Sequence, residues 1–490
     1  MKHVIIVGGG IAGLTAGVLL QKKGIQTELF EKNAVAGGQC MGWEREGCYI
    51  DNCIHWLTGT KEGTPLNELW KEVGALGDGV ELYEKPAFFS SERNGEKITF
   101  WRDKERTRRE LIALSPEDAM EINKLIDYVK IAESSTIPTE KPFDAMSVLD
   151  YMRLGMSMKG MMSVMKEYGK MDIYELAERF HHPLIQRAIC DYMPDGYQAY
   201  AFLVSYATIT SGNGDIPRGG SLQMVRRMVD KYVACGGTLH TSSPVDHVKI
   251  NGKKAEGVVL SNQKFIAGDG VILTCDTDFT FHHLLPEQYM PKGLKMEYRE
   301  TEKYPVTSGF QVAYAVQGVF PELSGTRIFP CTELEIGKSR ACCMSTNSYD
   351  YEPDFAPEGE TILQTNIVQT EEDYKYWKAL YQNRELYNKK KAELSEKLMT
   401  RLVNQYPFLQ GKIRVIDVWT PVTYERYCHS YKGAYMSFTV TRGAKNVRVP
   451  NKIKGLHNVF LGSQWQMGPG GLPTALAMGK FAAWHVMNLK

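Results

Sequence analysis

The spacing of apolar residues near the N-terminus predicts a strand, a helix and a second strand in close succession. Residues 4–7 (VIIV) form a β-branched run of the kind found in buried parallel strands. Apolar residues then recur at helical spacing from Ile11 to about Lys23, and residues 27–30 (TELF) again suit a strand. Glu31 closes this second strand. The pattern predicts an α/β protein that begins with a Rossmann-type unit.

The turn between the first strand and the helix has the spacing G-x-G-x-x-G, at Gly8, Gly10 and Gly13. The first glycine permits a tight turn, the second lets a pyrophosphate approach the backbone, and the third lets the helix pack closely on the strand. The N-terminus of the helix would bind the phosphates, and Glu31 would accept hydrogen bonds from a ribose diol. We therefore predict a dinucleotide site at Gly8, Gly10, Ile11, Ala12, Gly13, Glu31 and Lys32.

The choice between NAD and FAD rests on segments further along the chain. A second glycine pair, Gly37–Gly38, is similar to that of the large FAD-dependent oxidoreductases. At the other end, residues 458–462 suit a strand that enters a turn, residues 468–473 are rich in glycine and proline, and 474–488 suit a helix. The N-terminus of such a helix would stabilise the negative charge of a reduced flavin. Both ends of the chain therefore indicate FAD.

A third stretch continues the pattern in the middle of the chain. Residues 216–221 lead into an amphipathic helix. Strands are predicted at 244–248, 255–260 and 270–275.

Together these segments resemble the phytoene desaturase family of flavoproteins, which includes carotenoid desaturases, carotenoid cis–trans isomerases and retinol saturases. The resemblance implies that the backbone of Val245 contacts the adenine and that residues 462–472 line the flavin. It is found at residues 7–14, Glu31 with Gly37–Gly38, 217–220, around Val245, 420–421, 462–465 and 471–473. The cofactor residues implied beyond the first turn are Gly37, Gly38, Gln39, Val245, Cys275, Gly462, Gly471, Leu472 and Pro473.

Three positions depart from this resemblance. Gln39 stands where many relatives have a basic residue, residues 51–56 (DNCIHW) replace a glycine-rich run, and Cys275–Asp276 replaces an Asn-Ala turn. We therefore expect an outlying branch and do not assume a carotenoid substrate.

The regions between the FAD segments predict a second, discontinuous α+β domain that binds the substrate. The FAD-binding domain is expected at residues 1–74, 209–295 and 432–490, and the substrate domain at 75–208 and 296–431. Within the latter, residues 310–316 and 361–368 suit strands, and 372–404 suits one charged helix.

A methionine-rich stretch at residues 146–171 predicts a helical lid in the substrate domain. Met158, Met161, Met162 and Met165 follow the spacing of one helical face, and lysines surround them. This face suits either contact with a membrane and admission of an apolar substrate, or packing in the core. Both interpretations stay open.

Flavin chemistry needs orientation and exclusion of water more than it needs a nucleophile, because the cofactor performs the difficult step. Candidate acids, bases or orienting groups are His55 and Trp56, which follow the FAD segment, and Tyr424, Tyr427 and His429, which follow Thr420–Pro421. We name His55, Tyr424 and Tyr427 as the catalytic candidates. The adjacent His282 and His283 point to different sides of any regular element, so we expect no metal site.

Composition excludes several classes of function. The chain has 490 residues, with 58 Lys and Arg against 57 Asp and Glu, which argues against a nucleic-acid partner. The ten cysteines form no C-x-x-C pair, and the N-terminus has no secretory pattern, so we expect a reduced, cytoplasmic protein. Without a membrane-spanning apolar run, membrane contact would be peripheral.

We therefore expect an FAD-dependent oxidoreductase that acts on carbon–carbon double bonds of an apolar, lipid-like or polyene substrate. The reaction could be desaturation, saturation or flavin-dependent isomerisation. NAD(P)H, a quinone or another redox molecule is the expected electron partner. The alternatives are an amine oxidase-like enzyme, which an aromatic cage at the flavin would favour, and a flavin-binding protein without turnover.

Overall fold

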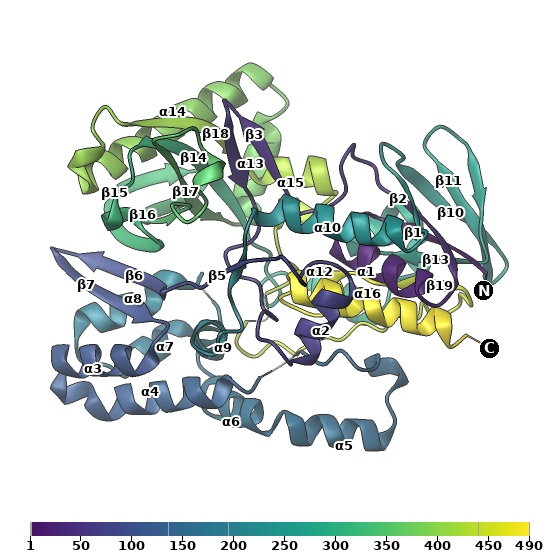
Figure 1. Cartoon of the computed structure of the whole chain (residues 1–490), viewed down its shortest axis with the longest axis horizontal. Coiled ribbons are helices and arrows are strands. Elements are labelled where there is room, and N and C mark those ends of the chain that lie inside the picture. Colours follow the sequence, from purple (N-terminus) through teal and green to yellow (C-terminus); the bar gives the residue numbers. More distant parts are fainter. Residues whose placement is uncertain (1, 136, 195, 440, 490) are drawn as a thin grey trace.

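The computed structural model, which describes residues 2–135, 137–194, 196–439 and 441–489, brings both ends and the middle of the chain into one sheet (Figure 1). All neighbouring strands in this sheet are parallel, so the predicted Rossmann-type α/β fold is confirmed. The strands, in spatial order, are β19 (Val459–Leu461), β13 (Gly270–Leu273), β1 (His3–Val7), β2 (Gln26–Phe30) and β9 (Thr238–His240).

Different layers cover the two faces of this sheet. On one face, Val4 and Ile6 pack with helices α1 (Ile11–Gln21), α10 (Gly220–Ala234) and α16 (Leu472–Met487). On the other face, Ile5 and Val7 pack against an antiparallel three-stranded sheet. That sheet consists of β10 (Val245–Asn251), β11 (Lys254–Leu260) and β12 (Phe265–Ala267).

A seven-stranded sheet forms the second half of the molecule, at the upper left of Figure 1. Segments far apart in sequence meet in this sheet, since β6 pairs with β15. This pair is parallel, and the other pairs are antiparallel. In spatial order its strands are β18 (Ile413–Trp419), β14 (Ser308–Gln317), β17 (Glu360–Gln369), β16 (Ser339–Ser348), β15 (Thr326–Ile336), β6 (Ala87–Arg93) and β7 (Glu96–Trp101).

Two helices pack on this sheet where the sequence predicted a single charged helix. They are α13 (Glu371–Leu380) and α14 (Arg384–Gln405). The single-helix prediction for 372–404 is therefore wrong. The side chain of Asn383 accepts a hydrogen bond from the backbone N–H of Leu386, so it caps a new helix instead of continuing the first one.

A helical lobe packs on the outer strands of the second sheet, at the lower left of Figure 1. Its core is rich in aromatic residues and includes Phe88, Phe89 and Phe100 from the two strands. The helices are α3 (Lys104–Leu114), α4 (Ala119–Ala132), α5 (Val148–Ser157), α6 (Lys159–Tyr168), α7 (Ile173–Ala177), α8 (Pro183–Tyr192) and α9 (Ala199–Thr210).

The methionine-rich stretch is helical, and its four evenly spaced methionines belong to α6 and its N-cap. Helix α5 ends at Ser157, and Met158 lies at the junction with α6. Met161 packs against the core of the lobe, whereas Met162 is 61% exposed. The stretch therefore forms two consecutive helices, and its methionines are packed in the core only in part. Of the helices described, none is both long and apolar enough to cross a membrane.

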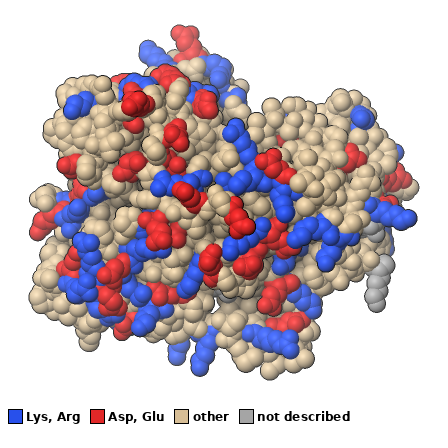
Figure 2. Space-filling model, viewed as in Figure 1, with Lys and Arg blue, Asp and Glu red and all other residues tan. Residues whose placement is uncertain are grey.

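Short elements complete the fold. They include two small antiparallel strand pairs and three short helices. They are β3 (Gly42–Arg45) with β4 (Cys48–Asp51), β5 (Leu82–Tyr83) with β8 (Ile216–Pro217), and α2 (Pro65–Glu72), α11 (Thr277–Phe279) and α12 (Lys292–Arg299). Helix α15 (Pro421–Cys428) follows the second sheet. Charges of both signs are interspersed over the face in Figure 2.

Replacement of Gly479 by alanine should destabilise the protein. A Cβ at Gly479 would clash with the carbonyl group of Ala12, where α16 crosses α1. We expect a loss of about 1–3 kcal/mol, as for other overpacked cores. Thermal unfolding checks this. Gly155→Ala is the matched control, because a Cβ at Gly155 meets no atom within 4 Å and alanine favours a helix by about 1 kcal/mol. Equal unfolding temperatures for the two variants would contradict the packing argument.

Candidate functional site

A cavity of about 490 Å³ lies between the parallel sheet and the seven-stranded sheet. Its lining comes from the glycine-rich turn after β1, from the start of α16 and from β14, β17 and α15. We call the end formed by the turn after β1 the nucleotide end. We call the end formed by the second sheet the substrate end, and define it by His55, Trp56, Gln311, Asn366, Tyr424 and Tyr435.

The nucleotide end has the features of a phosphate site. Gly10 is the N-cap of helix α1, and no side chain caps this N-terminus, so the first backbone N–H groups of the helix stay available. A Cβ at Gly10 would meet no atom closer than 3.9 Å, so a larger residue there would fill the cavity. At Gly13, by contrast, a Cβ would clash with the carbonyl oxygen of Gly8. Gly10 therefore serves the ligand, and Gly13 serves helix packing.

Glu31 is held at the end of β2 by the backbone around it. Its Oε2 accepts a hydrogen bond from the Gly9 N–H at 2.9 Å, and its Oε1 accepts from the N–H and the amide of Asn33 at 2.8 and 2.9 Å. Only 5% of the residue is exposed, although it lines the cavity. Each carboxylate oxygen can accept more than one hydrogen bond, so Glu31 can also accept from a ribose.

A chain of amide side chains joins the second glycine pair to the C-terminal segment. Gln39 donates from Nε2 to the carbonyl oxygen of Ala434 at 2.8 Å, and its Oε1 accepts from Gln464 Nε2 at 3.1 Å. Gln464 Oε1 accepts from the N–H of Gly471, where α16 begins without a side-chain cap. Gln39 thus binds protein amides, which explains why a basic residue is not needed there.

The structure brings most of the predicted cofactor residues to this cavity. Gly13 and Gly462 are the exceptions, because both are packed away from the lining, with Gly462 against α16. The predicted residues that line the cavity are Gly8, Gly10, Ile11, Ala12, Glu31, Lys32, Gly37, Gly38, Gln39, Val245, Cys275, Gly471, Leu472 and Pro473.

Tyr424 lies at the substrate end with its hydroxyl group fully engaged. The hydroxyl accepts hydrogen bonds from Gln311 Nε2 and Trp419 Nε1, and it donates to Asn52 Oδ1 at 2.9 Å. Burial raises the pKa of Tyr424 far above its ordinary value. Its proton is therefore held by Asn52, and this geometry suits a positioning residue better than a proton donor.

His55 also lines the substrate end, and its neighbours fix its protonation state. Asn347 accepts from the Thr326 hydroxyl through Oδ1, so its amide nitrogen faces His55 Nδ1 at 3.1 Å and donates to it. Burial, with a contribution from Lys85, lowers the pKa of His55 to about 4. At neutral pH the ring is uncharged, with its proton on Nε2.

Tyr427 and His429 lie elsewhere in the cavity. The side chain of Tyr427 is 51% exposed, and its backbone carbonyl oxygen accepts from Asn33 Nδ2, beside the nucleotide end. His429 stacks on Phe279 with ring centroids 4.1 Å apart. Neither residue therefore reaches the group formed by His55 and Tyr424.

Sequence reasoning missed three residues of the substrate end. Gln311 and Asn366 face each other across β14 and β17, and Tyr435 is hydrogen-bonded with Asn366. No local signal distinguishes these two amides, because β14 also contains Gln317 and β17 also contains Gln364 and Gln369. Tyr435 carries no local signal either.

The residues present fit FAD. Two uncapped helix N-termini, α1 and α16, face the same cavity from the two chain ends, and Gly10 leaves room that a Cβ would fill. Glu31 supplies the acceptor for a ribose. Val245, which the resemblance placed at the adenine, lines the same end.

Comparisons with known proteins agree with this fit. The sequence pattern of the family described as flavin containing amine oxidoreductase matches residues 11–487. The 4,4'-diaponeurosporene oxygenase of Staphylococcus aureus strain MW2 is 22% identical over 98% of this chain and 97% of its own length. An oxidoreductase from Methanosarcina mazei has a similar fold, with a TM-score of 0.62, 17% identity and 99% of each chain covered. Putrescine oxidase bound to putrescine also has a similar fold, with a TM-score of 0.59, 14% identity and 99% of each chain covered.

Protonation of His55 should cost stability in mild acid. The unfolded chain binds a proton at this histidine below its ordinary pKa near 6.5, whereas the folded protein does so only near 4, so stability falls as the pH drops through this window. Between pH 7 and pH 5, the free energy of unfolding of His55→Gln should therefore fall by about 2 kcal/mol less than that of the wild type. Unfolding temperatures at pH 7 and pH 5 measure it, with exposed His457→Gln as the control. An unchanged acid sensitivity in His55→Gln would contradict a neutral His55.

Proposed function

Because the chain belongs to the flavin-containing amine oxidoreductase family and is an FAD-dependent oxidoreductase, we propose that it acts on a carbon–carbon double bond. The proposed substrate is an apolar, polyene or lipid-like small molecule. The observation that carries this proposal is the neutral substrate end of the cofactor cavity. When bound, FAD supplies the hydride chemistry, and the protein supplies orientation and exclusion of water.

The substrate end has no group that would neutralise an ammonium ion. Its described residues are amides, aromatics and the uncharged His55. Of the residues that the structure describes, the acids that line the cavity are Glu31 and Asp276, and both follow strands of the parallel sheet at the nucleotide end. A charged amine would lose its hydration at the substrate end without gaining a carboxylate as counter-ion, which is costly. A neutral, apolar substrate meets no such penalty.

The aromatic residues at this end also favour an alkene over an amine. Among the residues that the structure describes there, Tyr424 and Tyr435 form the ring pair, with centroids 6.2 Å apart and planes inclined by 61°. An aromatic cage for an amine would need two facing walls. The carotenoid-related name of the Staphylococcus aureus relative supports a polyene-like substrate as well.

We assign two different roles to the catalytic candidates. His55 keeps its proton on Nε2 because Asn347 occupies Nδ1, so it is an uncharged wall of the substrate end. Tyr424 positions Asn52 and Gln311 through its saturated hydroxyl group. Trp56, which packs edge-on against Phe88, supplies an apolar wall that excludes water.

Anaerobic visible spectroscopy of the purified holoenzyme tests the proposal. Polyenes, retinoids and unsaturated fatty acids are added to oxidised and to dithionite-reduced protein, with NAD(P)H and a quinone as candidate electron partners. Bleaching of the oxidised flavin by one of these compounds indicates desaturation, and reoxidation of the reduced flavin by an alkene indicates saturation. A changed product with reduced flavin and no net electron transfer indicates isomerisation.

Amines provide the counter-experiment. If putrescine or another amine bleached the flavin while no alkene reacted in either redox state, the alkene proposal would be wrong. If the protein bound FAD and no compound of either class changed its spectrum or was converted, it would be a binding protein without turnover.

We further propose that α5 contacts a membrane surface from which an apolar substrate is taken. No residue of α5 is buried, although the helix carries Val148, Leu149, Tyr151, Met152 and Met156, which are 46–77% exposed. Leu149, Met152 and Met156 lie on one side of the helix. Basic residues nearby suit an anionic lipid surface.

Charge placed on this side of α5 should weaken membrane binding. We expect the triple variant Leu149→Glu/Met152→Glu/Met156→Glu to bind vesicles of phosphatidylglycerol and phosphatidylcholine at least tenfold more weakly than the wild type, because carboxylates cannot enter the lipid interface cheaply. Co-sedimentation measures this. Met120→Glu is the control, because Met120 is 83% exposed on α4, outside this helix. Equal vesicle binding by the triple variant and the wild type would exclude α5 as the contact.

A further inference from the structure

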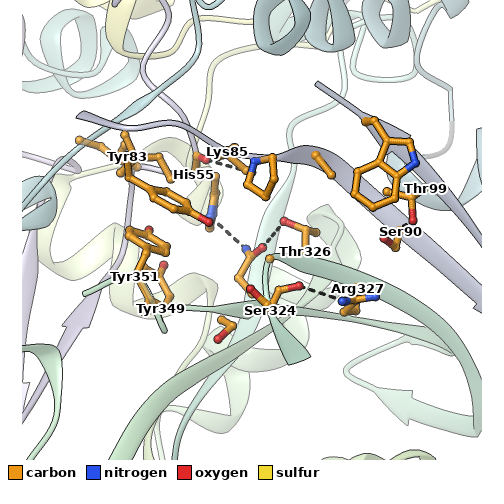
Figure 3. Close-up of a pocket in the computed structure, with 18 of the residues that line it drawn as sticks. His55, Tyr83, Lys85, Ser90, Thr99, Ser324, Thr326, Arg327, Tyr349 and Tyr351 are labelled. Atoms are coloured by element: carbon orange, nitrogen blue, oxygen red, sulfur yellow. Dashed lines mark hydrogen bonds between the residues drawn. The ribbon is translucent and has the colours of Figure 1, made fainter. Parts of the chain in front are cut away.

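A second cavity of about 130 Å³ adjoins the substrate end of the cofactor cavity. It lies between β5, the start of β6 and the ends of β15 and β16, as Figure 3 shows. His55 lines both cavities, so the two cavities meet at this residue. The second cavity is therefore close enough to hold one end of a molecule whose other end is in the cofactor cavity.

The most unusual group in this cavity is Lys85. The residue is only 6% exposed, and its Nζ donates to the backbone carbonyl oxygen of His55 at 3.3 Å (Figure 3). No carboxylate of a described residue lies within ion-pair distance of it. Burial lowers the pKa of Lys85 to about 8, so most of the lysine is still charged at neutral pH. An ammonium group has three donors, and the part of the chain that the structure describes supplies one acceptor.

The rest of the lining has the charge balance of an anion site. Its charged residues are Lys85, Lys97 and Arg327, and no described Asp or Glu lines it. Arg327 already pairs with Glu92 at 3.0 Å, and Lys97 is exposed. The uncompensated charge inside the cavity therefore belongs to Lys85.

Hydroxyl groups and aromatic rings make up the remaining wall. Tyr83 and Tyr351 stack with ring centroids 4.1 Å apart and planes parallel within 2°. Serine and threonine side chains from β6, β7, β15 and β16 face the same space. Such a wall accepts a small polar group together with a few attached carbons, which also suits the volume.

We propose that this second cavity binds the carboxylate of the substrate, with Lys85 as its counter-ion, so that the substrate is an unsaturated carboxylic acid. Its apolar chain passes His55 into the cofactor cavity. The assignment rests on the proposed action at a carbon–carbon double bond and narrows its substrate class. It also explains how one molecule can satisfy both a neutral substrate end and a neighbouring unpaired cation.

Ligand binding to the oxidised holoenzyme tests the site without requiring turnover. The probes are trans-2-decenoate and the uncharged trans-2-decen-1-ol, which have the same chain and double bond, and equilibrium dialysis gives their dissociation constants. We expect the wild type to bind the acid at least tenfold more tightly than the alcohol. Lys85→Met should remove this preference by weakening the acid at least tenfold, while the affinity for the alcohol changes less than twofold.

Lys391→Met is the matched control. Burial also lowers the pKa of Lys391, but this lysine lies on α14 and lines neither cavity, so its replacement should leave both affinities unchanged. If Lys85→Met did not fold, competition in the wild type would still decide, because octanoate should displace decenoate and octanol should not. Equal binding of acid and alcohol by the wild type, or an acid preference retained in Lys85→Met, would overturn the proposal.

The same experiment separates this inference from the proposed function. An acid preference that depends on Lys85, in an enzyme that converts no alkene, would support the anion site and reject the reaction. Conversion of neutral polyenes by an enzyme without any acid preference would support the reaction and reject the anion site.

Discussion

The crossing of α1 and α16 determines where the cofactor can bind. The two helices come from opposite ends of the chain, yet a single Cβ at Gly479 would press on the backbone of Ala12. This close approach brings both uncapped helix N-termini, at Gly10 and Gly471, to one cavity. A dinucleotide with a pyrophosphate at one place and a flavin ring at another needs both of them at a fixed separation. The close packing of small residues therefore fixes the positions of the groups that would bind the cofactor.

The sequence predicted the parts of the fold in which backbone geometry selects the residue. Glycine is required at Gly8 by a turn, at Gly10 by a ligand and at Gly13 by a helix contact. Such positions can be recognised without a structure. The seven-stranded sheet was less accessible, because β6 meets β15 more than two hundred residues later. The break between α13 and α14 also escaped, since charged residues fill both helices and only the cap at Asn383 marks the boundary.

Most of the nucleotide end could be predicted, whereas only His55, Trp56 and Tyr424 of the substrate end were named from the sequence, and the reason is physical. Nucleotide contacts are made largely by backbone groups within one βαβ unit, which leave a local pattern. The group around Tyr424 joins Asn52, Gln311 and Trp419 through side-chain hydrogen bonds, and Asn52 lies 372 residues away. Any of these residue types is ordinary on its own. Their meaning comes only from the tertiary contacts that place them together.

The distribution of charge around the cofactor cavity restricts the chemistry more than the family does, because one fold of this kind hosts several reactions. Acids lie at the nucleotide end, neutral groups lie at the substrate end, and an unpaired cation lies behind His55. Burial of the Lys85 ammonium group removes a charge from water, whereas a methionine would fill similar space without this cost. Lys85 therefore lowers the stability of the ligand-free protein. A bound carboxylate would compensate that cost and stabilise the folded state in proportion to its affinity. The position of Lys85 is thus better explained by a ligand than by the fold.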